Sequence, residues 1–374
     1  MIDIGVGVYN SNLEFIGEII QINSLQTVKN LQSASTISLN VDLVQENITL
    51  LNTSNFLILN SETTEDAEIY KIQYVQKNLN SDGSTSLVVQ GRNLWYIFSY
   101  RALTQIYNFN NANVGDIITE MITNECIKCK NPNRIYPNLQ LGNLTLNESI
   151  NYINPLASYS NPSLDDILDT SITNVLQAVG IGLQVKANLN TKIYTVSFII
   201  GRDLTLESDS DNPIVLSNAL NNITSEQFTL NTTNYTNVCY VSGTVNNVTE
   251  QVMCIKGSIE ASGYARQESA TSCEIEGLNT KDYLSQYQAI GQSYIASQDI
   301  FKNSSVELNI DNTNYKFNED FKLGDLITFI SEEWNIKESI EVCQVTETWS
   351  NGGYSVSLQL GKEQPTLAKI LKMR

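Results

Sequence analysis

Residues 88–103 read VVQGRNLWYIFSYRAL, and within this stretch the hydrophobic pattern changes from that of strands to that of helices. The two valines predict the end of a buried strand, and Gly91 is expected to break that strand and permit the turn into a helix. Five large apolar residues then follow between Arg92 and Arg101. We therefore expect a β module to end here and a helical segment to begin.

The helix expected over residues 93–100 places Leu94, Trp95 and Phe98 on a shared face, which is typical of core packing. Arg101, at the end of this helix, can lay its stem over aromatic surface and direct its guanidinium to backbone carbonyls. A base-stacking or DNA-binding role would need more basic residues nearby than this acidic chain provides. Core packing with an arginine clasp is therefore the favoured interpretation.

The rest of the chain divides on either side of this change. Residues 1–91 alternate as an antiparallel β module, and residues 92–212 mix helices with strands. Residues 213–302 are β-rich and end in a long amphipathic helix, and residues 303–374 alternate again. A chain of 374 residues is long enough for several such domains, since single cores seldom grow past about 250 residues. The sequence predicts a mainly β fold with α+β insertions and a β module at each end.

Individual elements follow from the same periodicities. Helices are expected at residues 42–51, 93–100, 114–124, 164–179 and 281–302. Strands are expected at residues 2–9, 13–22, 35–41, 67–76, 86–90, 183–187, 193–200, 237–243, 306–310, 315–317, 326–330, 340–349 and 354–360. The Gly180-Ile-Gly182 pair lies between a helix and a strand, the reverse of the order in a dinucleotide fingerprint, so it predicts a helix C-cap.

Composition excludes several functional classes. The formal net charge of -18 argues against a phosphate-gripping surface, because nucleic-acid affinity comes mostly from clustered Lys and Arg. The sequence contains no histidine, which excludes Ser-His-Asp and Cys-His hydrolases and His-ligated zinc enzymes. Carboxylate chemistry or a lysine nucleophile would remain for an enzyme.

The N-terminus, MIDIGVGVYNSN, has no basic region and carries an acid at position 3, so we do not expect a signal peptide. The longest apolar runs, such as residues 55–60 and 197–200, are too short to span a bilayer. We expect a chain made in a cytoplasm and not inserted into a membrane.

Six cysteines are present, and only Cys126 and Cys129 have the spacing of metal ligands. A structural zinc site would need a second pair, which the scattered remaining cysteines do not offer. Ordinary reduced thiols are the favoured interpretation, and no metal or cofactor is expected.

Four acidic clusters are the obvious candidates for catalysis: Glu62–Glu68, Asp165-Asp166, Glu207–Asp211 and Glu332-Glu333. Paired carboxylates could perform general acid-base hydrolysis of a sugar. Adjacent carboxylates, however, point in different directions along a helix or strand. Each cluster also falls where a solvated loop or a helix start is expected, so no catalytic residue is assigned.

The order of three local patterns resembles a known family. Gly91-Arg-Asn-Leu94 followed by Ser99-Tyr-Arg101 is similar to the opening signature of the siphovirus ReqiPepy-type tail protein family. Asn237-Val-Cys-Tyr-Val-Ser-Gly243 and Gly263-Tyr-Ala-Arg-Gln-Glu268 resemble its N-x-x-Y-V-x-G and G-x-x-R-x-E stretches. The residues that carry the resemblance are Gly91, Leu94, Trp95, Arg101, Asn237, Gly243, Gly263, Arg266, Gly324, Asp325 and Gly361.

The closing part of the resemblance is Leu323-Gly-Asp325-Leu-Ile-Thr328 and Leu358-Gln-Leu-Gly361 with Pro365, which look like the family's last barrel. One departure is the Gly91-Arg92-Asn93 sequence, where some relatives have a glycine-aspartate pair. The chain also stops at Arg374, so we expect no trailing lysozyme-like or peptidase domain. Any wall-cutting activity would then belong to another protein.

The resemblance implies a baseplate hub protein, a homotrimeric plug that closes the end of a phage tail tube. It implies two tube-forming antiparallel β-barrel domains per chain, at residues 1–91 and 303–374, with mixed domains at 92–212 and 213–302 between them. The implied partners are a distal tail or tail tube protein, a tape-measure protein and a spike or tip protein, with DNA only in passage. The implied location is the tail tip of the virion.

Two other functional classes remain open from the sequence. A carboxylate-dependent hydrolase of cell-wall polysaccharide would fit the acidic clusters and a tail-tip setting. A carbohydrate-binding β protein would explain the aromatic residues but not the two separate β modules.

Overall fold

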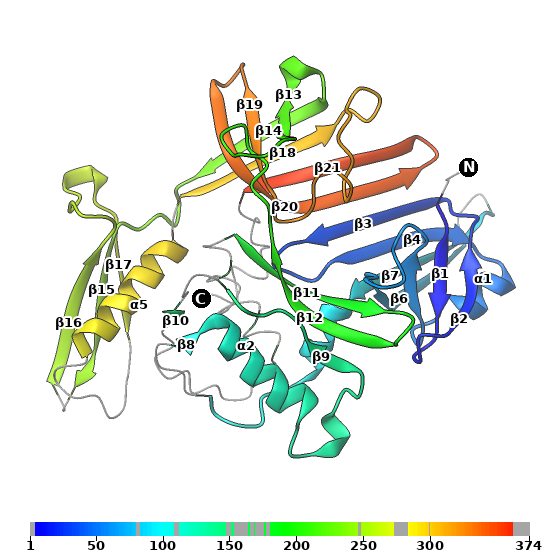
Figure 1. The fold of residues 1–374 in the computed structure, drawn as a ribbon, viewed down its shortest axis with the longest axis horizontal. Coiled ribbons are helices and arrows are strands. Elements are labelled where there is room, and N and C mark those ends of the chain that lie inside the picture. Colours follow the sequence, from blue (N-terminus) through cyan, green and yellow to red (C-terminus); the bar gives the residue numbers. More distant parts are fainter. Residues whose placement is uncertain are drawn as a thin grey trace.

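One large β-sheet contains strands from both the first and the last parts of the described chain (Figure 1). The computed structural model describes residues 4–79, 83–107, 112–146, 151–152, 180–245, 248–272, 283–298 and 300–361, together with Leu164, Leu168 and Leu176. The mainly β fold with α+β insertions predicted from the sequence is confirmed.

The first β module wraps around a core of alternating apolar side chains. Its strands are β1 (Val6–Tyr9), β2 (Phe15–Ile19), β3 (Ser24–Asn30), β4 (Thr36–Asp42), β5 (Phe56–Leu59), β6 (Tyr70–Leu79) and β7 (Thr85–Asn93), and the helix α1 (Gln45–Leu50) follows β4. They pair in the order β3-β4-β7-β6-β5-β1-β2. Leu25, Ile37, Leu39 and Val89 lie in one buried cluster because every second residue of a strand faces the same side.

The second β module has a core of its own. Its strands are β13 (Val215–Ser217), β14 (Ile223–Asn231), β18 (Phe301–Leu308), β19 (Leu326–Ser331), β20 (Ile336–Ser350) and β21 (Gly353–Gly361). They pair in the order β14-β18-β21-β20-β19-β13, and a short 3-10 helix, η5 (Asn218–Leu220), follows β13. Among the described strands, no pairing closes either module into a ring.

The two modules have the same strand order. Reading each path from β3 or from β14 gives strands that correspond one to one in chain order: β3 with β14, β4 with β18, β7 with β21, β6 with β20 and β5 with β19. The C-terminal half of β20 pairs antiparallel with β3, from Gln344 opposite Asn30 to Ser350 opposite Ser24. This seam makes the two modules one continuous sheet.

A mixed segment covers one side of this sheet, drawn in cyan and green below it in Figure 1. It contains η1 (Leu94–Tyr100), β8 (Ala112–Asn113), α2 (Val114–Ile122), a π-helical turn η2 (Thr123–Ile127), η3 (Pro132–Arg134), β9 (Leu139–Leu141), β10 (Asn151–Tyr152), β11 (Ile181–Asn188) and β12 (Ile193–Ile200). Asn113 caps α2 by accepting a hydrogen bond from the backbone N–H of Gly115 at 2.8 Å.

A smaller unit stands apart at the left of Figure 1. It consists of the sheet β16-β15-β17, with β15 (Val238–Val245), β16 (Val248–Ile255), β17 (Glu268–Ser272) and the turn η6 (Gly263–Ala265). Helix α5 (Tyr283–Ser297) packs on this sheet, where Tyr287 and Ile295 are buried with Cys239 and Val241.

The structure corrects three details of the sequence prediction. Gly91 does not break its strand, because β7 continues to Asn93 and Gly91 pairs with Ile37 and Ile72. The segment after it is a 3-10 helix with a tighter turn than an α-helix. Residues 315–317 form no strand, and Phe317 makes only an isolated bridge to Phe321.

The sequence prediction also left strands out: β3, β5, β8, β9, β10, β13, β14 and β16. The helix predicted over residues 164–179 lies almost entirely outside the described residues. Gly180, the predicted C-cap, has the positive φ of 68° that such a cap requires. Within the described part of the chain, no helix is long and apolar enough to cross a membrane.

Gly91→Ala should destabilise the first module by about 1–3 kcal/mol, because a Cβ at this position would lie 2.8 Å from the backbone oxygen of Lys71. Denaturant unfolding measures the loss. Gly352→Ala is the control, since its Cβ would meet nothing closer than the Ser350 hydroxyl at 3.5 Å. Equal midpoints for the two variants would contradict the close approach.

Candidate functional site

Arg101 ends η1 and joins it to the segment around η3. Its guanidinium donates to the backbone oxygen of Tyr100 at 3.1 Å and to that of Arg134 at 3.0 Å. It also lies over the ring of Tyr136, 3.9 Å from the centroid. Within η1, Trp95 and Phe98 pack edge to face. The arginine clasp predicted from the sequence is confirmed.

Arg92, the other arginine of the opening stretch, has a different role. It is half-buried on β7, where its backbone pairs with Thr36 and Lys71. Its side chain makes no hydrogen bond or ion pair with any residue that the structure describes. Only one of the two flanking arginines therefore holds the aromatic segment.

A buried carboxylate, which the sequence analysis missed, anchors the same region. Glu125 is fully buried and accepts hydrogen bonds from the backbone and hydroxyl of Thr104 and from the hydroxyl of Tyr107 at 2.9 Å. Arg134 binds it at 2.7 Å and also donates to the Ala102 oxygen. Glu125 directly precedes Cys126 and belongs to none of the acidic clusters, so the sequence pattern does not indicate its role.

Lys29 on β3, which the sequence analysis also missed, is a buried charge shared by three acidic side chains. Its ammonium lies 3.1 Å from Glu62, 3.8 Å from Glu68 and 3.9 Å from Glu347. Glu347 belongs to β20, so the cluster spans the seam between the two modules. The side-chain amide of Asn93 donates a hydrogen bond to the Glu68 carboxylate at 3.1 Å, which satisfies part of that carboxylate's remaining hydrogen-bond acceptor capacity.

The pKa values in this cluster move in the directions that pairing favours. Burial alone would lower the pKa of Lys29, but the charges of Glu68, Glu62 and Glu347 outweigh it and raise the pKa. Burial would raise the pKa of Glu68, but Lys186 and Lys29 outweigh it and lower the pKa. The stabilisation from Glu68 is therefore present above its ordinary pKa of 4.5 and is lost as the pH falls through the folded value.

The acidic clusters do not form a paired catalytic site within the described residues. Glu62 and Glu68 are held by one lysine inside the protein, as described above. Glu332 and Glu333 are both exposed at the turn between β19 and β20, and Glu207 pairs with Lys337 at 3.6 Å on the surface. Asp165 and Asp166 lie outside the described residues.

Asp325, one of the residues singled out from the sequence, joins the mixed segment to the second module. It is buried and binds the guanidinium of Arg202 at 2.6 Å, the Arg202 backbone N–H at 2.8 Å and the Lys322 backbone N–H at 2.7 Å. Its neighbour Gly324 has φ of 89°. A Cβ on Gly201 would lie only 1.7 Å from the Gly324 oxygen, so the two chain segments are in direct backbone contact.

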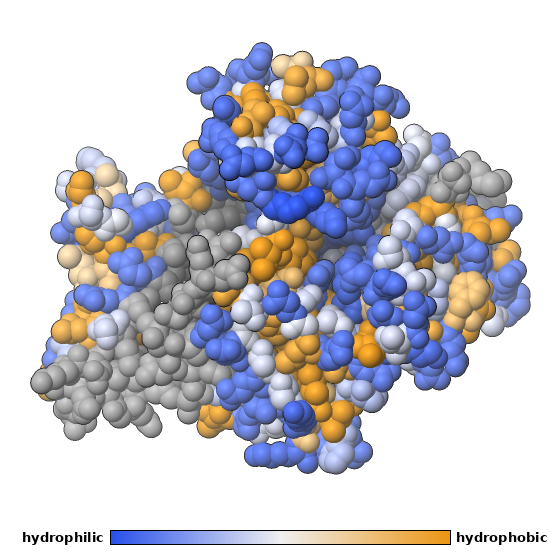
Figure 2. All heavy atoms as spheres, viewed as in Figure 1, coloured by the Kyte–Doolittle hydropathy of each residue, from blue (hydrophilic) through white to orange (hydrophobic). Residues whose placement is uncertain are grey.

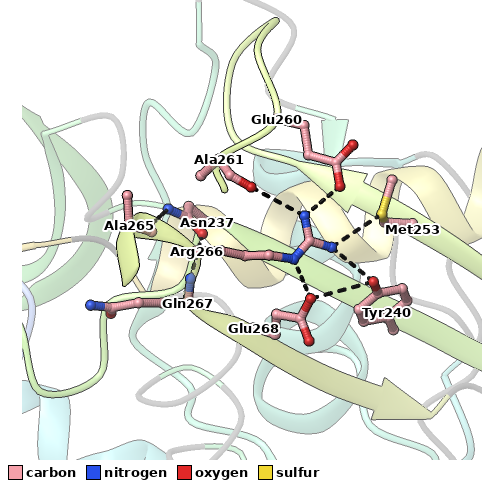
Figure 3. Close-up of polar contacts among 9 residues, drawn as sticks. All are labelled: Asn237, Tyr240, Met253, Glu260, Ala261, Ala265, Arg266, Gln267 and Glu268. Carbon is pink, nitrogen blue, oxygen red and sulfur yellow. Dashed lines mark hydrogen bonds and ion pairs between the residues drawn. The ribbon is translucent and has the colours of Figure 1, made fainter. Parts of the chain in front are cut away.

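Arg266 is the polar centre of the small outer unit (Figure 3). Its guanidinium binds the carboxylates of Glu260 and Glu268 and donates to the hydroxyl of Tyr240 at 2.8 Å. The hydrogen bonds to Glu268 and to Glu260 raise the pKa of Arg266 and keep it cationic. Its bonds link the turn η6 and strand β17 to strand β15.

Asn237 supports this arrangement from the start of β15 (Figure 3). Its side chain donates to the backbone oxygen of Ala265 at 2.7 Å and accepts from the backbone N–H of Gln267 at 2.9 Å. Gly263 opens η6 with φ of 58°. Asn237, Gly263 and Arg266 therefore hold the same turn and strands together, although Asn237 is distant from the other two in sequence.

The other glycines singled out from the sequence lie elsewhere. Gly243 lies in β15 opposite Glu250. Gly361 ends β21 with φ of 90°, and a Cβ there would lie 2.7 Å from the Lys302 oxygen. Gly361 therefore has a backbone reason to be glycine, and the two glycines lie on strands of different sheets.

Cys126 and Cys129 are both free thiols. Burial raises the pKa of Cys126 to about 12, so it is protonated at neutral pH. No group of three or more His, Cys, Asp or Glu side chains in the described part of the chain could hold a metal ion.

Figure 2 shows a largely hydrophilic face on which apolar residues form scattered groups.

The comparisons with known proteins agree with this architecture. The sequence profile described as Siphovirus ReqiPepy6 Gp37-like protein matches residues 6–362. No curated protein matches the chain in sequence.

Three solved structures share the fold across nearly their whole lengths. The tail protein from Neisseria meningitidis MC58 has a TM-score of 0.55 at 12% identity, with 96% of this chain and 97% of that chain covered. The prophage MuSo2 43 kDa tail protein from Shewanella oneidensis has a TM-score of 0.54 at 8% identity, with 95% and 98% covered. The prophage tail protein gp18 from Listeria monocytogenes EGD-e has a TM-score of 0.52 at 11% identity, with 99% and 98% covered.

Arg101→Ala should lower the free energy of unfolding by about 1–3 kcal/mol, because it removes two hydrogen bonds and the packing on Tyr136. Thermal or denaturant unfolding measures the change. Arg92→Ala is the matched control and should cost about 0.5 kcal/mol or less. If both arginines cost the same, the clasp does not stabilise the segment.

Lys29→Met should destabilise the protein by about 3–5 kcal/mol, because three acidic side chains would lose their buried counter-ion. The control is Lys302→Met, which breaks the more exposed pair with Glu338 and should cost about 1 kcal/mol or less. Denaturant unfolding at neutral pH compares the two. A Lys29 variant as stable as the Lys302 variant would show that the cluster contributes little to the seam.

Proposed function

Because the chain belongs to the family of Siphovirus ReqiPepy6 Gp37-like proteins, we propose that it is the trimeric hub that closes a phage tail tube. The resemblance seen in the sequence is confirmed by this membership, and the chain is a structural protein of the phage tail or baseplate type. The position at the tail tip, the trimer and the closing of the tube are the parts of the proposal that go further.

The repeated strand order is the observation that carries the proposal. One chain contains two β modules with corresponding strands, and they are joined edge to edge through β3 and β20. Three such chains would present six similar modules around one axis. A trimer could therefore stack on a sixfold tube ring without a mismatch in symmetry.

The charge of the chain fits passage of DNA through such a ring. Acidic residues exceed basic ones by 18, and several arginines are held by internal carboxylates or carbonyls. An acidic wall repels phosphates, so DNA would slide without being retained. The proposed partners are a distal tail or tube protein and a tape-measure protein on one side and a spike or tip protein on the other.

The proposed role is structural and not enzymatic. Glu62 and Glu68, which belong to one of the acidic clusters, are both paired with Lys29, an arrangement that serves charge pairing in the fold. The purified chain should leave the turbidity of a bacterial cell-wall suspension unchanged. Clearing of the suspension would favour the polysaccharide hydrolase instead.

Light scattering on the concentrated full-length chain should give three times the chain mass of 41.7 kDa. Electron microscopy of the assembled particle should show the two modules of each chain roughly 60° apart about a threefold axis, because six modules divide the circle equally. A stable dimer, or a ring in which only one module of each chain faces the axis, would contradict the hub assignment.

A further inference from the structure

The correspondence between the two modules extends to a bulge in one strand. In β20 the register with β21 shifts between Val342 and Gln344, and in β6 the register with β7 shifts between Ile72 and Tyr74. Val345 in β20 and Val75 in β6 are then at corresponding positions, and each lies opposite a buried residue of the neighbouring strand. The bulge therefore aligns β6 with β20 residue by residue.

The two strands differ in what lies beyond the bulge. Residues 344–350 of β20 pair with β3 on their outer side. Residues 74–79 of β6 pair with β7 alone among the described strands, because β5 reaches only Tyr70 and Lys71. The half of β6 that corresponds to the seam strand is therefore a free edge.

The strand that corresponds to β3 is free as well. β14 pairs with β18 and with no other described strand. When the pairing of β14 with β18 is aligned with the pairing of β3 with β4, Glu226 corresponds to Leu25. In the same alignment, Phe228 corresponds to Thr27. One chain thus has two separate free edges, β6 and β14, that correspond to the two strands of the β20–β3 seam.

Side chains at these two edges are left uncovered on the side of the sheet that faces the cores. Leu79 is 77% exposed although it lies on the same side of β6 as Val75, which faces the buried Val89. Leu230 is 56% exposed on the corresponding side of β14. Long free edges with apolar side chains favour pairing with another strand.

We infer that the C-terminal half of β6 pairs antiparallel with β14 of a second copy of this chain, in the register of the β20–β3 seam. That register places Val75 opposite Leu230, Lys77 opposite Phe228 and Leu79 opposite Glu226. The contact joins two different surfaces, so it continues from copy to copy, and it forms a ring if the rotation between copies closes. Closure at three copies rests on the proposed hub function.

Charge complementarity supports this partner. In the inferred register Lys77 is the diagonal neighbour of Glu226 on the same side of the sheet, within reach of a salt bridge. Lys77 makes no ion pair with a described residue, and one carboxylate oxygen of Glu226 is buried without a hydrogen-bond partner among them. Within the chain, the β3–β20 seam has a diagonal pair of the same kind, Lys29 with Glu347 at 3.9 Å.

Cysteine cross-linking of the full-length chain tests the register. Val75→Cys combined with Leu230→Cys should form a disulfide between copies under mild oxidation, and the adduct should end at three chains on a denaturing gel. The control is Gln76→Cys with Leu230→Cys, which places the thiols on opposite sides of the sheet and should cross-link far less. The wild type under the same oxidant gives the background from its native thiols.

Charge exchange gives a second test. Lys77→Glu should weaken self-association about tenfold or more, because it places a second carboxylate diagonal to Glu226, and Lys77→Glu with Glu226→Lys should restore it. Unchanged melting curves confirm that the variants fold. Failure of the double variant to recover association would contradict the predicted diagonal pair.

The outcomes separate this inference from the proposed function. A trimer by light scattering that does not cross-link through 75 and 230 would overturn the inferred seam and leave the trimeric hub standing. A register-specific ladder that runs past three chains would support the seam and overturn closure as a trimer. A chain that stays monomeric and does not cross-link, or that pairs through these edges only with another tail protein, would overturn the inference.

Discussion

The pairing of β3 with β20 is the contact on which the arrangement of the molecule depends. It turns two β modules, far apart in sequence, into a single sheet, and the Lys29 cluster lies along it. A slip of one residue would move Lys29 to the other side of the sheet and leave Glu62, Glu68 and Glu347 without their cation. The buried charges therefore specify the register of the seam as well as stabilise it.

Two further junctions fix the mixed segment to this sheet. Asp325 and Arg202 join it to the second module where Gly201 and Gly324 bring two backbones together. Arg101 ties the aromatic helix that follows the first module to the segment around η3. In a chain with 22 basic residues, several are used to satisfy internal acceptors, so the excess of acid remains for the surface. The use of basic side chains inside the fold therefore also fits the proposed acidic passage for DNA.

Much of the secondary structure followed from periodicity, and the failures have physical reasons. The strand β3 was missed because its core-facing side includes Thr27 and Lys29, which break the apolar alternation. The hydrogen bond of Arg101 to the Tyr100 oxygen was predictable because it is local, at the end of the helix, whereas its contacts with Arg134 and Tyr136 come from a segment far along the chain. The role of Gly91 was not predictable from the sequence, because the atom that requires a glycine there is the backbone oxygen of Lys71 on the neighbouring strand.

The sequence by itself determined the fold class, the absence of imidazole chemistry and the family, since composition, periodicity and short motifs are properties of the chain alone. The tertiary structure decided which charges meet. Glu62, Glu68 and Glu347 are distant from Lys29 in sequence, and only the pairing of strands brings them around one ammonium. It also decided that the two modules share a strand order and leave two complementary edges free, because hydrogen bonds between strands depend on which strands become neighbours in the folded sheet.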